Sequence, residues 1–337
     1  MYRVLIVCLL ALGLTPAMAH HGSAHYYDLD TVARVEGEIV SVSWRNPHVM
    51  LQLRRTDDGG ANEVWEIEGS SVNSLARVGV EGDSITVGAH VTITGAISRH
   101  GLPAMAGHVV TFEDGRDVPI WPRPAKRLGQ DIRPAPLSAE AAERARDQAI
   151  GIFRIWSRRD LTGLFLEDGY LPFTAAAEAA RAAWNPLEDD PVLDCTPRGM
   201  SSIMNTPHPV QFVDQGYSVM LRMEEFDTQR IIHIDDAVDP ETQPRTPLGY
   251  SVGRFEDART LVVTTTRISD PYFDDEGTPQ SEDAVVTERF SMTEDGTRLY
   301  YESIHEDPYT FTEPARWSSY WDWNPGEIIR RFDCVVQ

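Results

Sequence analysis

The sequence predicts a mainly β protein with some α structure, in two β-rich units joined by a proline-rich linker. Three observations support this fold class. Short apolar stretches that alternate with polar residues recur along most of the chain, and turn residues separate them. Prolines and polar residues crowd one central segment, residues 116–138. Apolar residues at helical spacing are confined to short segments, of which the clearest follow that linker.

The first residues have the pattern of a secretory signal peptide. Arg3 supplies a positive charge, residues 4–14 are apolar without interruption, and Ala17-Met18-Ala19 fits the small-x-small rule for cleavage. The apolar run is much shorter than the roughly 20 residues that cross a bilayer as a helix. We therefore expect residues 1–19 to be removed, and we expect a periplasmic or secreted protein with no membrane span.

Residues 20–115 are predicted to form a small closed barrel. Turn residues from Asp57 to Gly60 favour a hairpin, and a short helical segment is expected at residues 71–77. The expected strands are residues 35–44, 49–55, 63–67, 85–97 and 104–112. Five strands with a short helix before the fourth are typical of an oligonucleotide/oligosaccharide-binding barrel, here called an OB-like barrel. This fold does not determine the ligand.

Residues 139–337 are predicted to form the second unit, a helical lead-in followed by antiparallel strands. Ser138 is a suitable N-cap for a helix over residues 139–157, and a second helix is expected over residues 174–184. The expected strands are residues 217–223, 230–235, 260–266, 285–292, 299–304 and 328–332. Sequential strands of this kind favour a larger antiparallel barrel or curved sheet on which the two helices pack.

Two cysteines remain after removal of the leader, Cys195 and Cys334. An even pair in an exported chain indicates one disulfide bond, and the alternative is two unpaired buried thiols. Such a bond would join the start of the second unit to the end of the sequence.

The charge of the chain excludes several classes of function. A formal net charge of −22 disfavours binding to nucleic acid and to anionic lipid.

Lys126 is the only lysine and lies among prolines. A phosphate-binding loop, a Schiff base and a serine-lysine dyad each need a suitably placed lysine, so none of them is expected.

Several motifs resemble those of a known family. The segments His20-His21-Gly22-Ser23, Trp44-Arg45-Asn46-Pro47-His48 and Trp65-Glu66-Ile67-Glu68, followed by residues 74–79, resemble exported bacterial proteins of domain-of-unknown-function family 6152. The resemblance covers roughly residues 20–115. It implies export and this architecture, and it implies no known activity.

The second unit resembles a companion region of similarly uncharacterised exported proteins. Such relatives often carry a histidine where Gln280 precedes Ser281, and this departure weakens the case for a metal-binding role of that loop. The segments that carry the resemblance are residues 195–199, 248–255, 261–265, 287–290 and 306–310.

Histidines near the expected new N-terminus suggest a copper site. If cleavage follows Ala19, the free amine and imidazole of His20 offer two nitrogen donors, a set that suits copper(II). His48 is the expected third ligand, and the substitutes are His21, His100 and His108. The alternative interpretation is a solvated N-terminal arm and a histidine that bonds the backbone of its own turn.

The second unit suggests a different function. A β-barrel lined with aromatic rings can hold a small hydrophobic ligand, although the same rings can simply fill the core. The aromatic residues considered are Phe255, Phe290, Tyr301, Trp317, Tyr320 and Trp323. The leading hypothesis is a periplasmic binding protein that handles copper through its N-terminal histidine. The second hypothesis is an enzyme or carrier for a small hydrophobic molecule held in the second unit.

No catalytic or cofactor-binding motif stands out. Asp274-Asp275-Glu276-Gly277 lacks the alternating spacing of a calcium loop, so a solvated acidic loop is expected. His305, Glu306 and Asp307 are neighbours on a strand and point to opposite faces, so they are not expected to converge. Zinc-protease, nucleophile-elbow and dinucleotide-binding motifs are absent from the sequence. A binding role is therefore favoured over catalysis.

Overall fold

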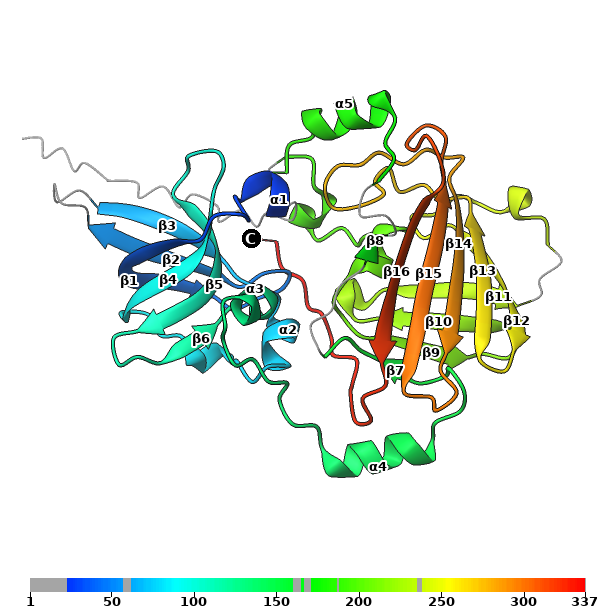
Figure 1. Ribbon diagram of the computed structural model, residues 1–337, viewed down its shortest axis with the longest axis horizontal. Helices are drawn as coiled ribbons and strands as arrows, with labels where there is room; N and C mark the ends of the chain where they lie inside the picture. The colour runs from blue at the N-terminus through cyan, green and yellow to red at the C-terminus, as the bar shows by residue number, and fades with distance from the viewer. Residues whose placement is uncertain are drawn as a thin grey trace, which may run out of the picture.

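The computed structural model shows two β-rich units side by side (Figure 1). It describes residues 23–56, 62–159, 165–166, 171–186, 188–234 and 238–336. The predicted signal peptide, His20, His21 and the hairpin turn expected at residues 57–60 lie outside the described residues.

The first unit is a closed five-stranded barrel with one added edge strand, which confirms the predicted OB-like architecture. Its strand order is β3-β2-β1-β4-β5-β6, and a parallel pairing of β3 with β5 closes it. The strands are β1 (Ala33–Ser43), β2 (Met50–Thr56), β3 (Asn62–Glu68), β4 (His90–Ile97), β5 (Ala104–Phe112) and β6 (Asp117–Pro119).

The strands of the barrel form where apolar and polar residues alternate in the sequence. In β1, Val35 and Ile39 are buried in the barrel core. A short helix, α2 (Val72–Ala76), precedes β4 as predicted, and Ser71 caps it by accepting a hydrogen bond from the Ser74 amide. Gly107 allows close packing inside the barrel, because an added Cβ would lie only 2.6 Å from the side chain of Ile67.

The segment expected as a linker, residues 116–138, begins as part of this unit. Strand β6 pairs with β5, and α3 (Pro122–Arg127) follows it. Ile120 and Ala125 are fully buried. The polypeptide therefore leaves the barrel only after α3.

The second unit is a nearly closed, mostly antiparallel barrel, as predicted. Its strand order is β7-β9-β10-β11-β12-β13-β14-β15-β16-β8, and β11 and β12 pair in parallel. Its strands are β7 (Ile155–Trp156), β8 (Phe165–Leu166), β9 (Val210–Asp214), β10 (Ser218–Met223), β11 (Gln229–Ile234), β12 (Tyr250–Asp257), β13 (Thr260–Thr266), β14 (Val285–Met292), β15 (Arg298–Glu306) and β16 (Ala315–Asp322).

Two predicted elements of the second unit are wrong, and three of its strands, β9, β12 and β16, are not among those predicted. The helix expected over residues 139–157 is α4 (Ala139–Asp147), which ends at the C-cap Gln148; Gly151 then takes a left-handed φ of 51°, and the chain pairs with β9 as β7. The strand expected at residues 328–332 is absent from the described structure, where this stretch is a tail without strand pairing. The second predicted helix is confirmed as α5 (Ala175–Ala183). Within the described part of the chain, no helix has the length and apolar character needed to span a bilayer.

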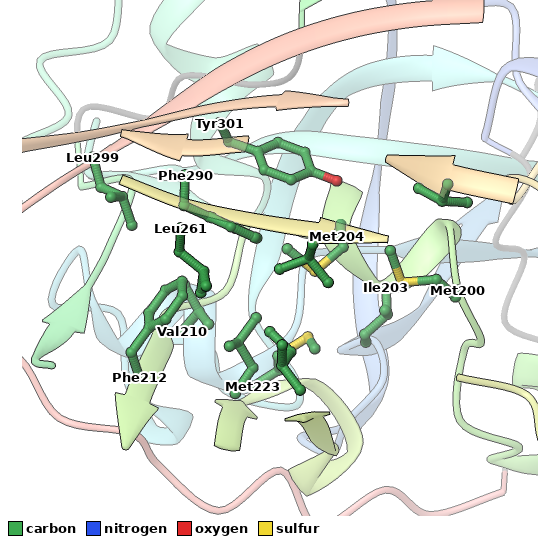
Figure 2. Close-up of a cluster of buried hydrophobic side chains, with 14 of the residues drawn as sticks. Met200, Ile203, Met204, Val210, Phe212, Met223, Leu261, Phe290, Leu299 and Tyr301 are labelled. Carbon is green, nitrogen blue, oxygen red and sulfur yellow. The ribbon is translucent and has the colours of Figure 1, made fainter. Parts of the chain in front are cut away.

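Side chains fill the interior of the second barrel (Figure 2). Phe290 and Tyr301 are completely buried, and their ring centroids lie 5.2 Å apart. Trp317 is also buried, whereas Phe255 is 36% exposed. Of the aromatic residues considered for a ligand cavity, Phe290, Tyr301 and Trp317 therefore belong to the core.

The tail, residues 323–336, runs between the two units (Figure 1). The Val335 amide donates to the Asn46 carbonyl at 3.0 Å, and the side-chain amide of Asn46 donates to the carbonyl of Phe332. On the other side, the Phe332 amide donates to Asp227 at 3.3 Å. The tail thus bonds to both barrels.

Candidate functional site

A cavity of about 140 Å³ opens on the second unit. Its walls come mainly from two stretches that are distant in sequence: residues 184 and 190–202, which follow α5, and residues 269–275, in the loop after β13. We call it the acidic pocket because four aspartates line it, namely Asp190, Asp270, Asp274 and Asp275.

One wall of the acidic pocket is aromatic. The rings of Trp184 and Tyr272 meet edge to face, with centroids 6.5 Å apart. Gly277 packs against the indole so closely that an added Cβ would lie 2.2 Å from it. On another side, the ring of His25, in α1 (Ser23–Tyr26), lies 5.7 Å from that of Trp184. The N-terminal arm therefore reaches a residue of the pocket wall.

Asp190 is a buried acid of the pocket, with 5% of its surface exposed. Its Oδ1 accepts a hydrogen bond from the Val192 amide at 3.0 Å, at the start of a short 3-10 helix. Its Oδ2 has no hydrogen-bond partner among the described residues. Burial raises the pKa of Asp190, and Arg198 opposes that rise. A buried carboxylate oxygen without a partner is unfavourable, so a donor from a ligand would be bound favourably here.

Two further acids of the pocket have raised pKa values. Burial raises the pKa of Asp270. Burial also raises the pKa of Asp275 to about 6; Arg198 opposes this rise, and the neighbouring carboxylates of Asp274 and Glu276 add to it. Four aspartates and one arginine line the pocket, so its carboxyl groups outnumber its cations, and this favours a cationic occupant.

Arg198 is the cation of the acidic pocket. Its Nε donates to Glu225 Oε1 at 2.8 Å, its Nη1 donates to Ser202 at 3.2 Å, and its Nη2 lies 3.6 Å from Asp275 Oδ2. Burial alone would lower its pKa, but Asp275 and Glu225 outweigh that effect, so the pKa is raised. Arg198 is therefore a permanently charged group shared among carboxylates.

A line of contacting acidic and basic side chains leads from Arg198 across the molecule. Glu225 Oε2 lies 3.7 Å from His208 Nε2, and His208 Nδ1 lies 3.2 Å from Glu224 Oε1. Glu224 accepts two hydrogen bonds from Arg77, at 2.7 and 2.6 Å. We call the whole line the charge ladder; its members are Asp275, Arg198, Glu225, His208, Glu224, Arg77, Glu327 and Arg159.

The charge ladder joins the two units and the tail. Arg77 follows α2 in the first unit, Glu224 follows β10 in the second, and Glu327 belongs to the tail. Arg77 Nε lies 3.3 Å from Glu327 Oε1, and Arg159 Nη1 lies 2.8 Å from Glu327 Oε2. Burial would raise the pKa of Glu224, but hydrogen bonds from His208 and Arg77 lower it to about 2. Glu224 is therefore held in its charged form at the interface.

The predicted disulfide bond is confirmed. Cys195 and Cys334 are joined, with their Cα atoms 5.9 Å apart. Cys195 directly precedes the pocket residues Thr196 and Arg198, and Cys334 lies in the tail. The bond therefore fixes the pocket wall to the tail.

The structure describes three of the histidines predicted as copper ligands. His48 Nδ1 lies 2.7 Å from the Gly69 carbonyl and 3.1 Å from Glu68 Oε1, and burial lowers the pKa of this histidine to about 4. His108 is buried, and burial lowers its pKa to about 4 as well. The ring of His100 lies 5.3 Å from that of Tyr26. Among the described residues, no three histidine, cysteine or acidic side chains form a group that could hold a metal ion.

The acidic loop from Asp274 to Glu276 is only partly solvated, because the side chains of Asp275 and Glu276 are 40% and 38% exposed and that of Asp274 is 10% exposed. Arg181 in α5 places Nη1 3.0 Å from Asp274 Oδ2 and Nη2 2.6 Å from Glu276 Oε2, so the loop is anchored. The reason is a tertiary partner almost a hundred residues away in the sequence, which local spacing cannot reveal.

His305 and Asp307 do not converge on one site, as the sequence predicts. His305 Nδ1 lies 2.9 Å from Ser201 Oγ, and its Nε2 lies 3.0 Å from Ser303 Oγ. Asp307 instead accepts hydrogen bonds from Ser281. His305 and Asp307 therefore serve separate polar contacts.

Comparison with known proteins bears on the first unit. Residues 8–106 match the model of a family of unknown function (DUF6152). No curated protein matches the chain. The N-terminal part of the chain is therefore similar to the DUF6152 family, and the matched residues do not include the acidic pocket.

Proposed function

We propose that this protein is an exported binding protein whose acidic pocket holds a small molecule with a protonated amine and an apolar body. The observation that carries the proposal is Asp190, a buried carboxylate whose Oδ2 lacks a hydrogen-bond partner among the described residues. An ammonium group would supply both the missing donor and the opposite charge.

The composition of the wall supports an amine over a neutral ligand. Asp270 and Asp275 add negative charge, and Arg198 is already shared with Glu225. The indole of Trp184 offers an apolar surface that also attracts cations. The volume of about 140 Å³ limits the occupant to a small molecule.

A titration of the full exported protein with phenethylamine tests this proposal, with phenylethanol as a neutral analogue of the same shape. We expect phenethylamine to bind more tightly, by isothermal titration calorimetry. Asp190→Asn keeps the cap oxygen and removes the charge, and it should weaken amine binding by about tenfold or more. Asp194→Asn is the control, because Asp194 lies on the same short helix, is exposed and does not line the pocket. Equal affinities for both compounds would contradict the proposal.

A further inference from the structure

A second cavity, of about 80 Å³, lies where the two units meet. Its lining comes from α2 and the residues after it, from α3, from the segments before α4 and before β9, and from the chain after β7. Four of the lining residues are arginines, namely Arg77, Arg123, Arg158 and Arg159. None of its described lining residues is acidic. We call it the arginine pocket.

Positive charge is concentrated at the arginine pocket. Arg77 and Arg159 share one carboxylate, that of Glu327, and Arg77 also binds Glu224. Four arginine side chains thus line one small cavity, in a chain whose formal net charge is −22. Such a local concentration of positive charge favours an anionic occupant.

Arg158 is fixed in position at this pocket. Its Nη1 donates to the Thr206 carbonyl at 2.6 Å and its Nε donates to the Tyr320 carbonyl at 3.3 Å. Its guanidinium also lies 4.4 Å from the centre of the Trp321 ring. These contacts orient the group. A guanidinium held in one orientation loses little entropy when it binds an oxyanion.

Arg123 completes the pocket from the first unit. It lies on α3 and is exposed, whereas Arg158 is buried. An exposed arginine at the rim and a fixed one behind it suit an anion that enters from solvent. The small volume matches a single tetrahedral oxyanion.

We propose that the arginine pocket binds a small oxyanion, either free phosphate or sulfate or the phosphate group of a small monoester. Planar guanidinium groups match such oxygens in pairs. This site is separate from the acidic pocket, and the inference does not depend on the amine proposal.

Calorimetric titration of the full protein with inorganic phosphate, sulfate and glycerol phosphate tests the inference, with sodium chloride at equal ionic strength as the reference. We expect saturable binding of at least one oxyanion. Tighter binding of inorganic phosphate or sulfate would identify a free ion as the occupant, and tighter binding of glycerol phosphate would identify a monoester.

Two arginines of the same helix supply matched variants. Arg123→Ala should weaken oxyanion binding by about tenfold, because one charged contact is lost. Arg127→Ala should leave it unchanged, because Arg127 ends the same helix and does not line the pocket. Circular dichroism of both variants checks that they fold. No oxyanion-specific heat in the unaltered protein, or equal losses in the two variants, would overturn the inference.

Discussion

Replacing Arg77 with methionine should destabilise the protein strongly. Methionine keeps much of the apolar stem of arginine and removes the charge. The side chains of Glu224 and Glu327 are 0% and 2% exposed, so both would remain buried with one fewer cation. Removing one partner of a buried ion pair costs about 3–5 kcal/mol.

Urea unfolding at neutral pH, followed by tryptophan fluorescence, measures this loss. Arg54→Met is the matched control, because Arg54 pairs with Glu38 and their side chains are 43% and 31% exposed. An exposed pair contributes about 0–1 kcal/mol, so the control should unfold almost like the unaltered protein. Equal unfolding midpoints for the two variants would refute the reasoning, because the buried charges would then not depend on Arg77.

A double variant separates charge from shape. Glu224→Gln combined with Arg77→Met removes one of the stranded charges. If the stranded charge causes the loss, the double variant should unfold at a higher urea concentration than Arg77→Met alone. A lower midpoint would point to lost packing instead.

The same structure and sequence predict three further outcomes. The pKa values of His48 and His108 are about 4 in the folded protein, below the ordinary 6.5. As the pH falls, these histidines therefore take up protons in the unfolded chain before they do so in the folded one. Stability should therefore be complete above about pH 6.5 and should decrease as the pH falls towards 4, by urea midpoint; a constant midpoint would contradict this. Replacing Cys195 and Cys334 by serine should lower stability by about 3–5 kcal/mol in the same assay, and no loss would mean that the bond does not constrain the unfolded chain. Under the copper hypothesis, mass spectrometry of the exported protein should show one bound copper ion, lost when an alanine precedes His20; binding no greater than in a denatured control would exclude the copper site.

The sequence predicts the first unit well because its signals are local. Alternation in Val35 to Ile39 and the turn chemistry around them need no distant partner. The helix predicted to residue 157 is wrong beyond Asp147. Ile152 and Trp156 have helical spacing, but they are buried in the core of the second unit without being part of a helix.

The candidate site could not be predicted in the same way. Asp190, Arg198 and Asp275 come from segments without a common motif, and the fold alone brings them together. The disulfide was predictable for two reasons. Only two cysteines remain after the predicted leader, and that leader predicts an oxidising compartment, in which such a pair forms a disulfide. The charge ladder gave no signal, since arginine and glutamate are common on every protein surface.

The tail between the barrels has a mechanical consequence. The polypeptide crosses from one unit to the other after α3, and the tail binds the first unit again through Asn46. A clamshell motion about one hinge would have to break this second connection along with the contacts of Arg77. Ligands should therefore enter through rearrangement of local loops, while the two lobes keep a fixed orientation.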